Sequence, residues 1–432
     1  MSRPLSPRTV TQFYLASLCS LFLLFPGLRG YAAITAGKFV LLALLTAGYA
    51  ALLLRSGRHS PRGLWSRLDA PRKCVLLYLL WSGLSTLFSL SPALSFWGGA
   101  RREGLITLLL YGAVFFTGTL GRPTKALLWV FGVGVSLCCV LALFQLAGFN
   151  PLALYPRGLT WQDGNLRYAG QFLGTVGNVG LLSAVLCVAI PVFWVGLLRL
   201  EDRRRFLLLL PLGLSLSVLL LSRVEAGLVG VFGGALLTLP VVSPHRRRPL
   251  LLAVLALLAG LFLTVWFFGG QMGGFLYEAH EVLHGRWRDE FGSGRLYIWK
   301  NVLPLVPERL WLGGGPETLA LRREILFERW DETLGLLLQS VADTAHNEYL
   351  HVLVCQGLPA LLFYLGALGF ACAGWIKHAP TDPAAAMLGA GVLGYCIQAF
   401  FGISSVVSAP FFWGALGLLV GNLPQNAKKQ ST

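Results

Sequence analysis

The chain has 432 residues, of which 55% are hydrophobic and only 12% are charged, and its mean hydropathy is +0.67. This composition excludes a water-soluble enzyme, because apolar runs of about 17–25 residues, each long enough to cross a ~30 Å hydrocarbon core as a helix, recur along almost the whole chain. The formal net charge of +16 could suggest nucleic-acid binding. In so apolar a chain, however, the positions of the basic residues must first be compared with a membrane topology.

Apolar runs separated by charged residues or by Gly and Pro predict an all-α, polytopic membrane protein with about twelve transmembrane helices. The first run follows Arg3 and Arg8 as in a signal peptide, but no small-x-small cleavage site follows it, so we interpret it as a membrane helix. All eight cysteines lie in or beside apolar segments, which indicates buried apolar side chains rather than disulfides. In chain order, the predicted spans are 10–28, 36–54, 74–91, 103–120, 126–147, 179–198, 206–222, 226–242, 250–269, 352–376, 384–402 and 406–422.

The basic residues divide unequally between the two sides of these spans. With the N-terminus inside, the inner connections carry twenty Lys and Arg residues and the short outer connections carry seven. This positive-inside bias places both termini in the cytoplasm. The long loop at 270–351 is exempt from the count, because long segments translocate largely regardless of charge. The predicted organisation is therefore helices one to nine in 1–269, an extracytoplasmic loop in 270–351, and helices ten to twelve with a short cytoplasmic tail in 352–432.

The long outer loop differs in composition from the spans. It carries 12 of the 19 acidic residues of the chain, which predicts a folded cap rather than a tail. Within it, residues 296–306 and 316–329 have helical periodicity with polar faces, a pattern typical of helices that lie on a membrane surface or over a cavity. A second outer loop, 148–178, is shorter and rich in Gly, Tyr and Arg.

A literal HExxH motif at 280–284 indicates an alternative function, a membrane zinc metallopeptidase. In that interpretation His280 and His284 would bind zinc from one helical face and Glu281 would act as general base on a metal-bound water. Such a site also needs a longer helix and a third ligand. Because Gly285 follows the motif at once, the helix is expected to be short, and we treat this function as the lesser alternative.

Three residues on the predicted outer side have both ordinary and functional interpretations. Arg223 lies at the outer membrane boundary between two spans, where it could snorkel, pair with Glu225 or form an anion site. Arg295 follows a Gly-Ser-Gly turn and opens a helix, a position where an isolated Arg is usually a solvated loop charge. His346 precedes the tenth span, at the depth of lipid headgroups, where an imidazole can exchange a proton near neutral pH or simply be satisfied by its neighbours.

Three stretches of the sequence resemble the O-antigen ligase and polymerase family, which joins lipid-linked glycans at the outer face of bacterial cytoplasmic membranes. They are RYAGQFLGTVGN at 167–178, Ser-Arg at 222–223, and the region 292–358, which contains GSGRLYIWKNVLPLVPERLWLGGGPETL and AHNEYLHVLVCQGL. The resemblance implies a glycosyltransferase whose donor is a glycan on a polyprenyl diphosphate such as undecaprenyl diphosphate, used without cofactor, metal or nucleotide sugar. Ligases, polymerases and protein O-oligosaccharyltransferases share these motifs, so the acceptor remains open among a lipid-core sugar, a growing glycan and a protein hydroxyl.

The resemblance also implies roles for individual residues. His346 would be the base that takes the proton of the acceptor hydroxyl, and Arg223 and Arg295 would bind the diphosphate. Because the signature contains no evident carboxylate nucleophile, a single displacement that inverts the anomeric carbon is expected. The active site would face the periplasm or exterior, among membrane lipids and without nucleic acid. The residues predicted to bind substrate are Arg167, Arg101, Arg102, Asn347 and Trp299.

Overall fold

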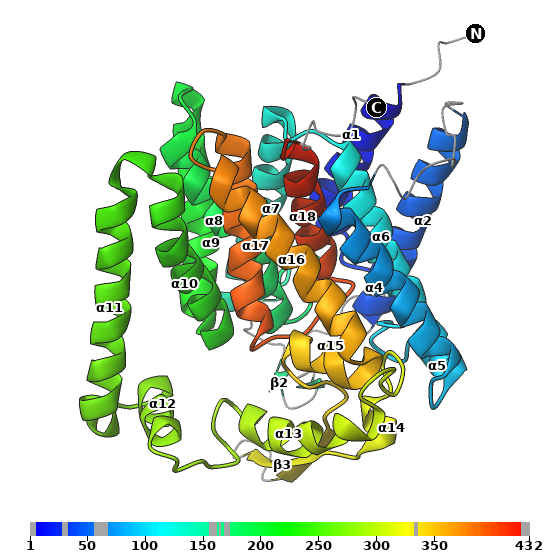
Figure 1. The fold of residues 1–432 in the computed structure, drawn as a ribbon, viewed down its shortest axis with the longest axis vertical. Helices are drawn as coiled ribbons and strands as arrows, with labels where there is room; N and C mark the ends of the chain where they lie inside the picture. Colours follow the sequence, from blue (N-terminus) through cyan, green and yellow to red (C-terminus); the bar gives the residue numbers. More distant parts are fainter. Residues whose placement is uncertain are drawn as a thin grey trace.

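The computed structural model describes residues 6–27, 33–55, 68–154, 162–163, 166–167, 173–331 and 336–424. It shows a bundle of helices, and shorter helices and strands form a cap over one end of this bundle (Figure 1). Much of the predicted outer loop 148–178 lies outside the described residues, as does most of the basic connection 55–73.

The predicted all-helical membrane region is confirmed, and each predicted span falls on a helix. Within the described residues, seven helices are long and apolar enough to cross a membrane, and three further apolar helices are shorter. The chain is therefore a polytopic membrane protein, while the total of twelve spans stays a prediction. The helices that fall on the predicted spans are α1 (Pro7–Ser17), which continues into the π-helical turn η1 (Leu18–Phe22), α2 (Ile34–Arg55), α4 (Ala70–Leu87), α6 (Leu105–Leu120), α7 (Lys125–Leu146), α8 (Val179–Arg199), α9 (Leu209–Ser222), α10 (Glu225–Val242), α11 (Arg247–Phe268), α16 (Leu358–His378), α17 (Pro383–Ala399) and α18 (Ala409–Asn422).

Small residues let the central helices of the bundle approach closely. A Cβ atom on Gly234 of α10 would lie 3.0 Å from the Cα atom of Gly394 in α17, and one on Gly118 of α6 would lie 2.9 Å from the carbonyl oxygen of Gly414 in α18. Such contacts stabilise membrane helices, because lipid supplies no hydrophobic force between them. The helix α8 lies at the centre with 78% of its apolar window buried, whereas α11 stands at the edge with 11% buried (Figure 1). The leucines of α11 therefore face lipid.

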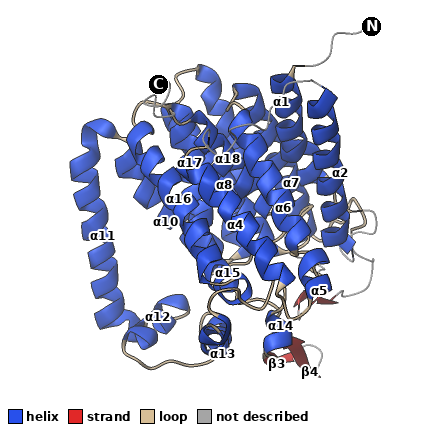
Figure 2. Cartoon of the chain, turned by 45° about the vertical axis from the view of Figure 1, so that its right-hand side comes forward, coloured by secondary structure: helices blue, strands red, loops and turns tan. Residues whose placement is uncertain are grey.

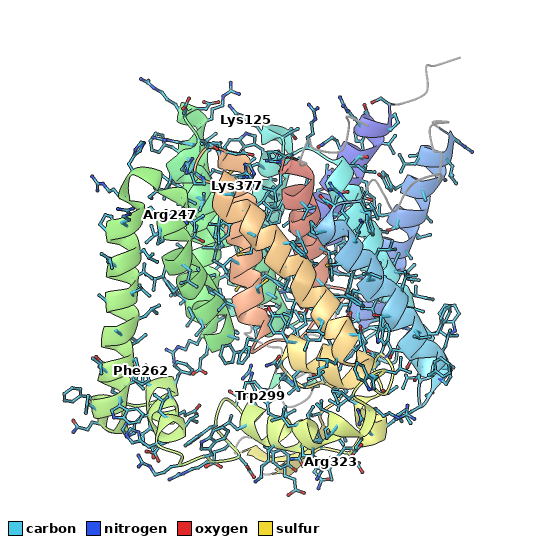
Figure 3. All side chains as sticks on the ribbon, viewed as in Figure 1. Lys125, Arg247, Phe262, Trp299, Arg323 and Lys377 are labelled. Carbon is cyan, nitrogen blue, oxygen red and sulfur yellow. The ribbon has the colours of Figure 1, made fainter. Side chains whose placement is uncertain are left out.

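Polar contacts bring the predicted inner connections together at one end of the bundle. Lys125 Nζ lies 3.2 Å from Asp202 Oδ2, and the guanidinium of Arg199 donates to the carbonyl oxygens of Val242 and Pro380. Helix α1 reaches the same end of the bundle, because Gln12 Nε2 donates a hydrogen bond to the carbonyl oxygen of Arg122 at 2.9 Å. Figure 3 shows basic side chains at this end and the cap at the other, with labels on Lys125, Arg247 and Lys377 and, opposite them, on Trp299 and Arg323.

The cap consists of short helices and a β-hairpin, and it corrects one prediction. The predicted helix at 296–306 is confirmed as α13 (Arg295–Val302) with a following 3₁₀ turn. The predicted helix at 316–329 is wrong beyond α14 (Leu319–Arg322), because β3 (Leu326–Asp331) pairs antiparallel with β4 (Leu336–Val341). Helical periodicity in one segment does not reveal a partner strand ten residues further on. Figure 2 shows this hairpin at the tip of the cap. The remaining short elements at this end are α5 (Pro92–Trp97), β1 (Gln162–Asp163), β2 (Leu166–Arg167), α12 (Phe275–Leu283) and α15 (Glu348–Gln356).

The predicted tenth span, 352–376, is broken at Gly357. The helix α15 ends at Gln356 and α16 starts at Leu358, with Gly357 in the left-handed region at φ 87°. A side chain at this glycine would overlap the carbonyl oxygen of Trp311 in the cap. The break therefore turns α15 away from the membrane helix and joins it to the cap.

Gly357→Ala is expected to destabilise the protein. The left-handed backbone would cost about 1–3 kcal/mol for a non-glycine residue, and the overlap with the Trp311 carbonyl oxygen adds to this. The matched control is Gly369→Ala, in the middle of α16, where a Cβ meets nothing within 4 Å and alanine is expected to be neutral or slightly stabilising. The apparent melting temperature of the detergent-solubilised protein checks both. Equal melting temperatures for the two variants would contradict the interpretation of this break.

Candidate functional site

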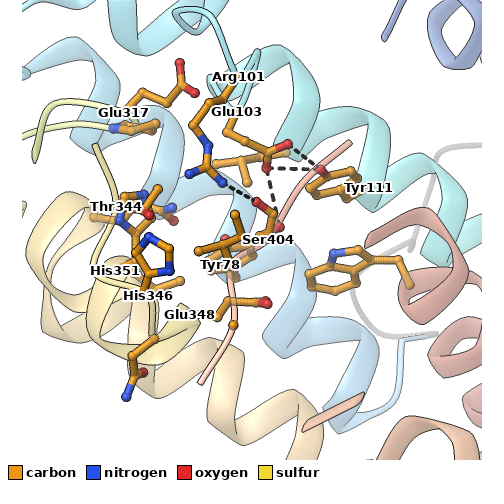
Figure 4. Close-up of a pocket in the computed structure, with 18 residues that line it drawn as sticks. Tyr78, Arg101, Glu103, Tyr111, Glu317, Thr344, His346, Glu348, His351 and Ser404 are labelled. Carbon is orange, nitrogen blue, oxygen red and sulfur yellow. Dashed lines mark hydrogen bonds between the residues drawn. The ribbon is translucent and has the colours of Figure 1, made fainter. Parts of the chain in front are cut away.

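A cavity lies where the cap meets the membrane helices. Segments far apart in the sequence form it: the loop before α6 with the start of that helix, the turn at 316–317, the segment 344–356 that includes α15, and the loop between α17 and α18. Tyr78 of α4 and Trp413 of α18 complete the lining. Its lining is rich in titratable groups, as Figure 4 shows. Besides two tyrosines, these groups are Arg101, Glu103, Glu317, His346, Glu348 and His351.

The backbone at His346 is fixed on both sides. The indole Nε1 of Trp299 donates to the carbonyl oxygen of Ala345 over 2.9 Å, and the buried side chain of Asn347 caps α15 by accepting from the amide of Leu350 at 3.0 Å. Between them His346 adopts φ 45°. Left-handed conformations are unusual for residues other than glycine and concentrate at functional sites, where the surrounding structure must enforce them.

The imidazole of His346 lines the cavity. It makes no hydrogen bond to the part of the chain that the structure describes. Burial, together with the guanidinium groups of Arg295 and Arg101, lowers the pKa of His346 to about 4, against an opposing effect of Asp343. The imidazole is therefore neutral at pH 7, with a nitrogen lone pair available to accept a proton.

Arg101 brings a fixed positive charge into the same cavity. Its Nη2 donates to the carbonyl oxygen of Ser404 at 3.0 Å, and its Nη1 lies 3.2 Å from an oxygen of the exposed Asp343. The neighbouring Arg102 does not line the cavity; its carbonyl oxygen accepts a hydrogen bond from Thr107. The structure therefore places Arg101, but not Arg102, beside His346.

Arg295 lines a second, largely apolar pocket of about 260 Å³. It follows Gly294, which has φ 81°. Its Nε donates to the carbonyl oxygen of Phe401 at 2.9 Å and its Nη1 to that of Gly292 at 2.6 Å. No hydrogen bond from its Nη2 to another described residue is present. Trp299 lines the same pocket, which lies between α10, α12 and α13.

Arg223 lies outside both pockets. It ends α9 at φ 53° with an exposed side chain. The pairing with Glu225 considered above is not among the ion pairs of the described residues; Glu225 instead lines the Arg295 pocket. Burial lowers the pKa of Arg295, and the carboxylates of Glu225 and Glu278 oppose this effect. Arg167 lies in β2, but its side chain is outside the described residues.

Two buried carboxylates in the cavity were missed by the sequence analysis. Glu103 accepts hydrogen bonds from the Tyr111 hydroxyl at 2.8 and 3.0 Å, and Glu348 accepts from Tyr364 at 2.8 Å and from Tyr395 at 3.0 Å. An acidic side chain at the edge of a membrane span has a high free-energy cost, so its presence in the sequence indicates a candidate functional residue. Nothing in the sequence, however, indicates that these two residues share a cavity.

The HExxH residues make packing contacts. The Nδ1 of His280 lies 2.8 Å from the carbonyl oxygen of Val265 in α11, and the two imidazole rings of the motif lie 4.1 Å apart. Glu281 accepts two hydrogen bonds from the Arg286 guanidinium, at 2.9 and 2.6 Å. Among the residues that the structure describes, no group of three or more His, Cys, Asp or Glu residues could bind a metal ion. The contact of His280 attaches α12 to the end of α11, and the contacts of the motif give the metallopeptidase alternative no support.

A comparison with known protein families finds a match for the part of the chain that carries Arg223, Arg295 and His346. The family profile described as O-antigen ligase matches residues 210–365. The matched range runs from α9 into α16 and includes Arg223, Arg295 and His346. No curated protein matches the chain. Over residues 210–365 the protein thus contains a domain of the O-antigen ligase family.

Proposed function

We propose that the protein is a membrane glycosyltransferase of the O-antigen ligase type. It transfers a glycan from a polyprenyl diphosphate carrier to an acceptor hydroxyl at the outer face of the cytoplasmic membrane. One observation carries the proposal: His346, a neutral imidazole, lines the same cavity as Arg101 (Figure 4), and the guanidinium group of Arg295 is close enough to lower its pKa. This cavity lies under the cap, at the end of the bundle opposite the clustered inner connections (Figure 3). The match of residues 210–365 to the O-antigen ligase family supports it.

The chemistry follows from what the two kinds of side chain provide. The acceptor oxygen attacks the anomeric carbon of the donor sugar while its proton passes to His346. The bond between that carbon and the phosphate oxygen breaks, and its electron pair leaves on the polyprenyl diphosphate. Arginine stabilises this developing charge well, because its planar guanidinium offers several donors to phosphate oxygens. A single displacement without a covalent intermediate inverts the anomeric configuration and requires no metal.

The apolar pocket beside Arg295 fits a donor that is half lipid. Its lining includes Phe275, Val282 and Phe401, while Arg295 is fixed at its edge. A polyprenyl chain would lie along such side chains with its diphosphate at the guanidinium. Arg223 ends α9 two residues before Glu225, which lines this pocket, so we propose it as a second contact to the diphosphate. Arg167 remains a proposed substrate-binding residue on sequence grounds.

The experiment that tests the proposed function is deletion of the gene in its own bacterium. Lipid-linked glycan is expected to accumulate, and the wild-type gene is expected to clear it. Long lipid-linked chains after deletion would identify a ligase, and single repeat units would identify a polymerase. Transfer to a protein hydroxyl would identify an O-oligosaccharyltransferase.

Transfer by the purified protein is expected to be unchanged in EDTA; loss of transfer in EDTA would contradict the metal-independent mechanism.

The acid limb of the pH profile is expected to lie well below the ordinary pKa of histidine. Because the pKa of His346 is lowered to about 4, the imidazole remains neutral and active down to about pH 5, and kcat/KM falls only as the pH approaches 4. Arg101→Gln removes one of the guanidinium groups that lower this pKa, so its acid limb is expected at higher pH. The ratio of kcat/KM at about pH 5.5 to that at about pH 7.5 measures the difference. Arg323→Gln, on the exposed side of the cap, serves as control, and a wild-type limb near 6.5 would contradict the assignment.

A further inference from the structure

We propose that Glu317 and Thr344 form a subsite for saccharide hydroxyl groups beside His346. The inference rests on the proposed function and concerns recognition of the sugar, which the arginines do not provide. Both side chains line the cavity that contains His346 and Arg101, as Figure 4 shows. Glu317 comes from the Gly-rich turn of the cap, and Thr344 comes from the segment that leads into α15.

Each of these residues has a buried polar atom without a partner. Thr344 is 5% exposed. Neither its Oγ1 nor the Oε1 of Glu317 has a hydrogen-bond partner within the described part of the chain. Nearly all buried polar atoms in native structures are hydrogen-bonded, so two exceptions in one cavity require an explanation. A ligand that donates to the carboxylate and pairs with the hydroxyl would satisfy both atoms.

The carboxylate of Glu317 is held in place. Its Oε2 accepts a hydrogen bond from the amide of Gly99, and the residue adopts φ 57°. The turn that carries it is fixed by hydrogen bonds from Ser95 Oγ to the Pro316 carbonyl oxygen, at 2.9 Å, and from the Gly315 amide to a carbonyl of α15, at 2.7 Å. Hydrogen bonds to the rest of the cap therefore hold Glu317 in one position at the wall of the cavity, as a binding residue must be held.

The size and the lining of the cavity favour the edge of a sugar. The space inside it is about 40 Å³, which corresponds to about three oxygen-sized groups at roughly 10–15 Å³ each. One or two hydroxyl groups fit, whereas a whole sugar ring does not. Glu103 and Glu348 line the same cavity, but their oxygens already accept hydrogen bonds from tyrosine hydroxyl groups. Among the described lining residues, Glu317 is therefore the carboxylate with an oxygen left for a ligand.

Two sugars can present such an edge. If the acceptor sugar binds there, the hydroxyl group next to the attacking one would enter the subsite. Glu317 and Thr344 would then determine which acceptor oxygen faces His346. In the donor, a hydroxyl next to the anomeric carbon would enter. The binding chemistry is the same, because in both cases an O–H donates to the carboxylate. A site built to hydrogen-bond a hydroxyl discriminates strongly against a ligand that lacks it.

The test uses the full-length protein in phospholipid vesicles, with lipid-linked glycan and acceptor extracted from the bacterium that carries the gene. The variants are Glu317→Gln and Thr344→Val, which preserve shape, and the control is Glu324→Gln, an exposed acid of the same loop. KM and kcat are measured for each substrate, together with the affinity for undecaprenyl diphosphate without sugar. We expect Glu317→Gln to raise the KM for one sugar-bearing substrate about tenfold, Thr344→Val to raise it about threefold, and the affinity for bare undecaprenyl diphosphate to be unchanged.

The substrate whose KM rises identifies the sugar that the subsite binds, and a rise for either one supports the proposal. Unchanged KM values for both substrates would overturn it, and so would a loss of kcat alone, which indicates a structural role. A loss of affinity for bare undecaprenyl diphosphate would overturn it as well, because the residues would then act on the diphosphate. Absence of transfer by the wild-type protein would instead refute the proposed function, and the subsite with it.

Discussion

Replacing His346 is expected to reduce glycan transfer by about 10²- to 10⁴-fold, the usual contribution of a general base. Asparagine is the most informative replacement, because His346 has φ 45° and asparagine tolerates the left-handed region better than most residues. His346→Asn thus removes the base and preserves the backbone between the Trp299 contact and the Asn347 cap. Transfer to acceptor is measured in membranes that contain equal amounts of each protein.

The control for this experiment is His245→Asn, an exposed histidine just before α11, at the end of the bundle opposite the cavity. It is expected to transfer glycan at the wild-type rate. Both variants should insert in the membrane and melt at similar temperatures, because the His346 imidazole makes no hydrogen bond to the described residues. Wild-type turnover by His346→Asn would refute the proposed base.

The sequence predicts the membrane helices well because their signal is local. An apolar run such as that of α8 specifies a helix from end to end, since a membrane leaves few alternatives for its backbone. The break at Gly357 was missed because it depends on the Trp311 carbonyl oxygen, which lies 46 positions away in the sequence. The hairpin of β3 and β4 was missed for a similar reason: a strand is stabilised by its partner.

The site was predictable only in part. His346 and Arg295 stand in motifs, so the resemblance to a family could single them out. Arg101 and Arg102 are neighbours of identical chemistry, and only the contact with the Ser404 carbonyl oxygen and the position in the cavity distinguish them. Glu317 belongs to the same signature loop, but the sequence does not show that Gly99 donates to its Oε2 while its Oε1 has no partner among the described residues.

Arg295→Lys is expected to reduce transfer about 10²-fold, as loss of one well-placed donor to a transition-state oxygen usually does. The variant keeps the positive charge, so the effect isolates the geometry of the guanidinium. In the wild-type protein Nε and Nη1 bind the carbonyl oxygens of Phe401 and Gly292, which orients the remaining nitrogen. A lysine ammonium is a single point charge that cannot bind both carbonyl oxygens and still present an oriented donor.

The readout for Arg295→Lys is the affinity for undecaprenyl diphosphate together with kcat, because a contact to the leaving diphosphate is expected to affect both. Arg323→Lys is the matched control, since Arg323 lies in the same loop with an exposed side chain, and it should behave as wild type. If Arg295→Lys binds undecaprenyl diphosphate and transfers glycan as well as the wild-type protein, the diphosphate lies elsewhere, and Arg101 becomes the guanidinium nearest the reaction. If Arg295→Lys and Arg101→Gln each lower kcat while only the former lowers diphosphate affinity, the two arginines have different roles: Arg295 binds the donor, and Arg101 sets the charge around His346.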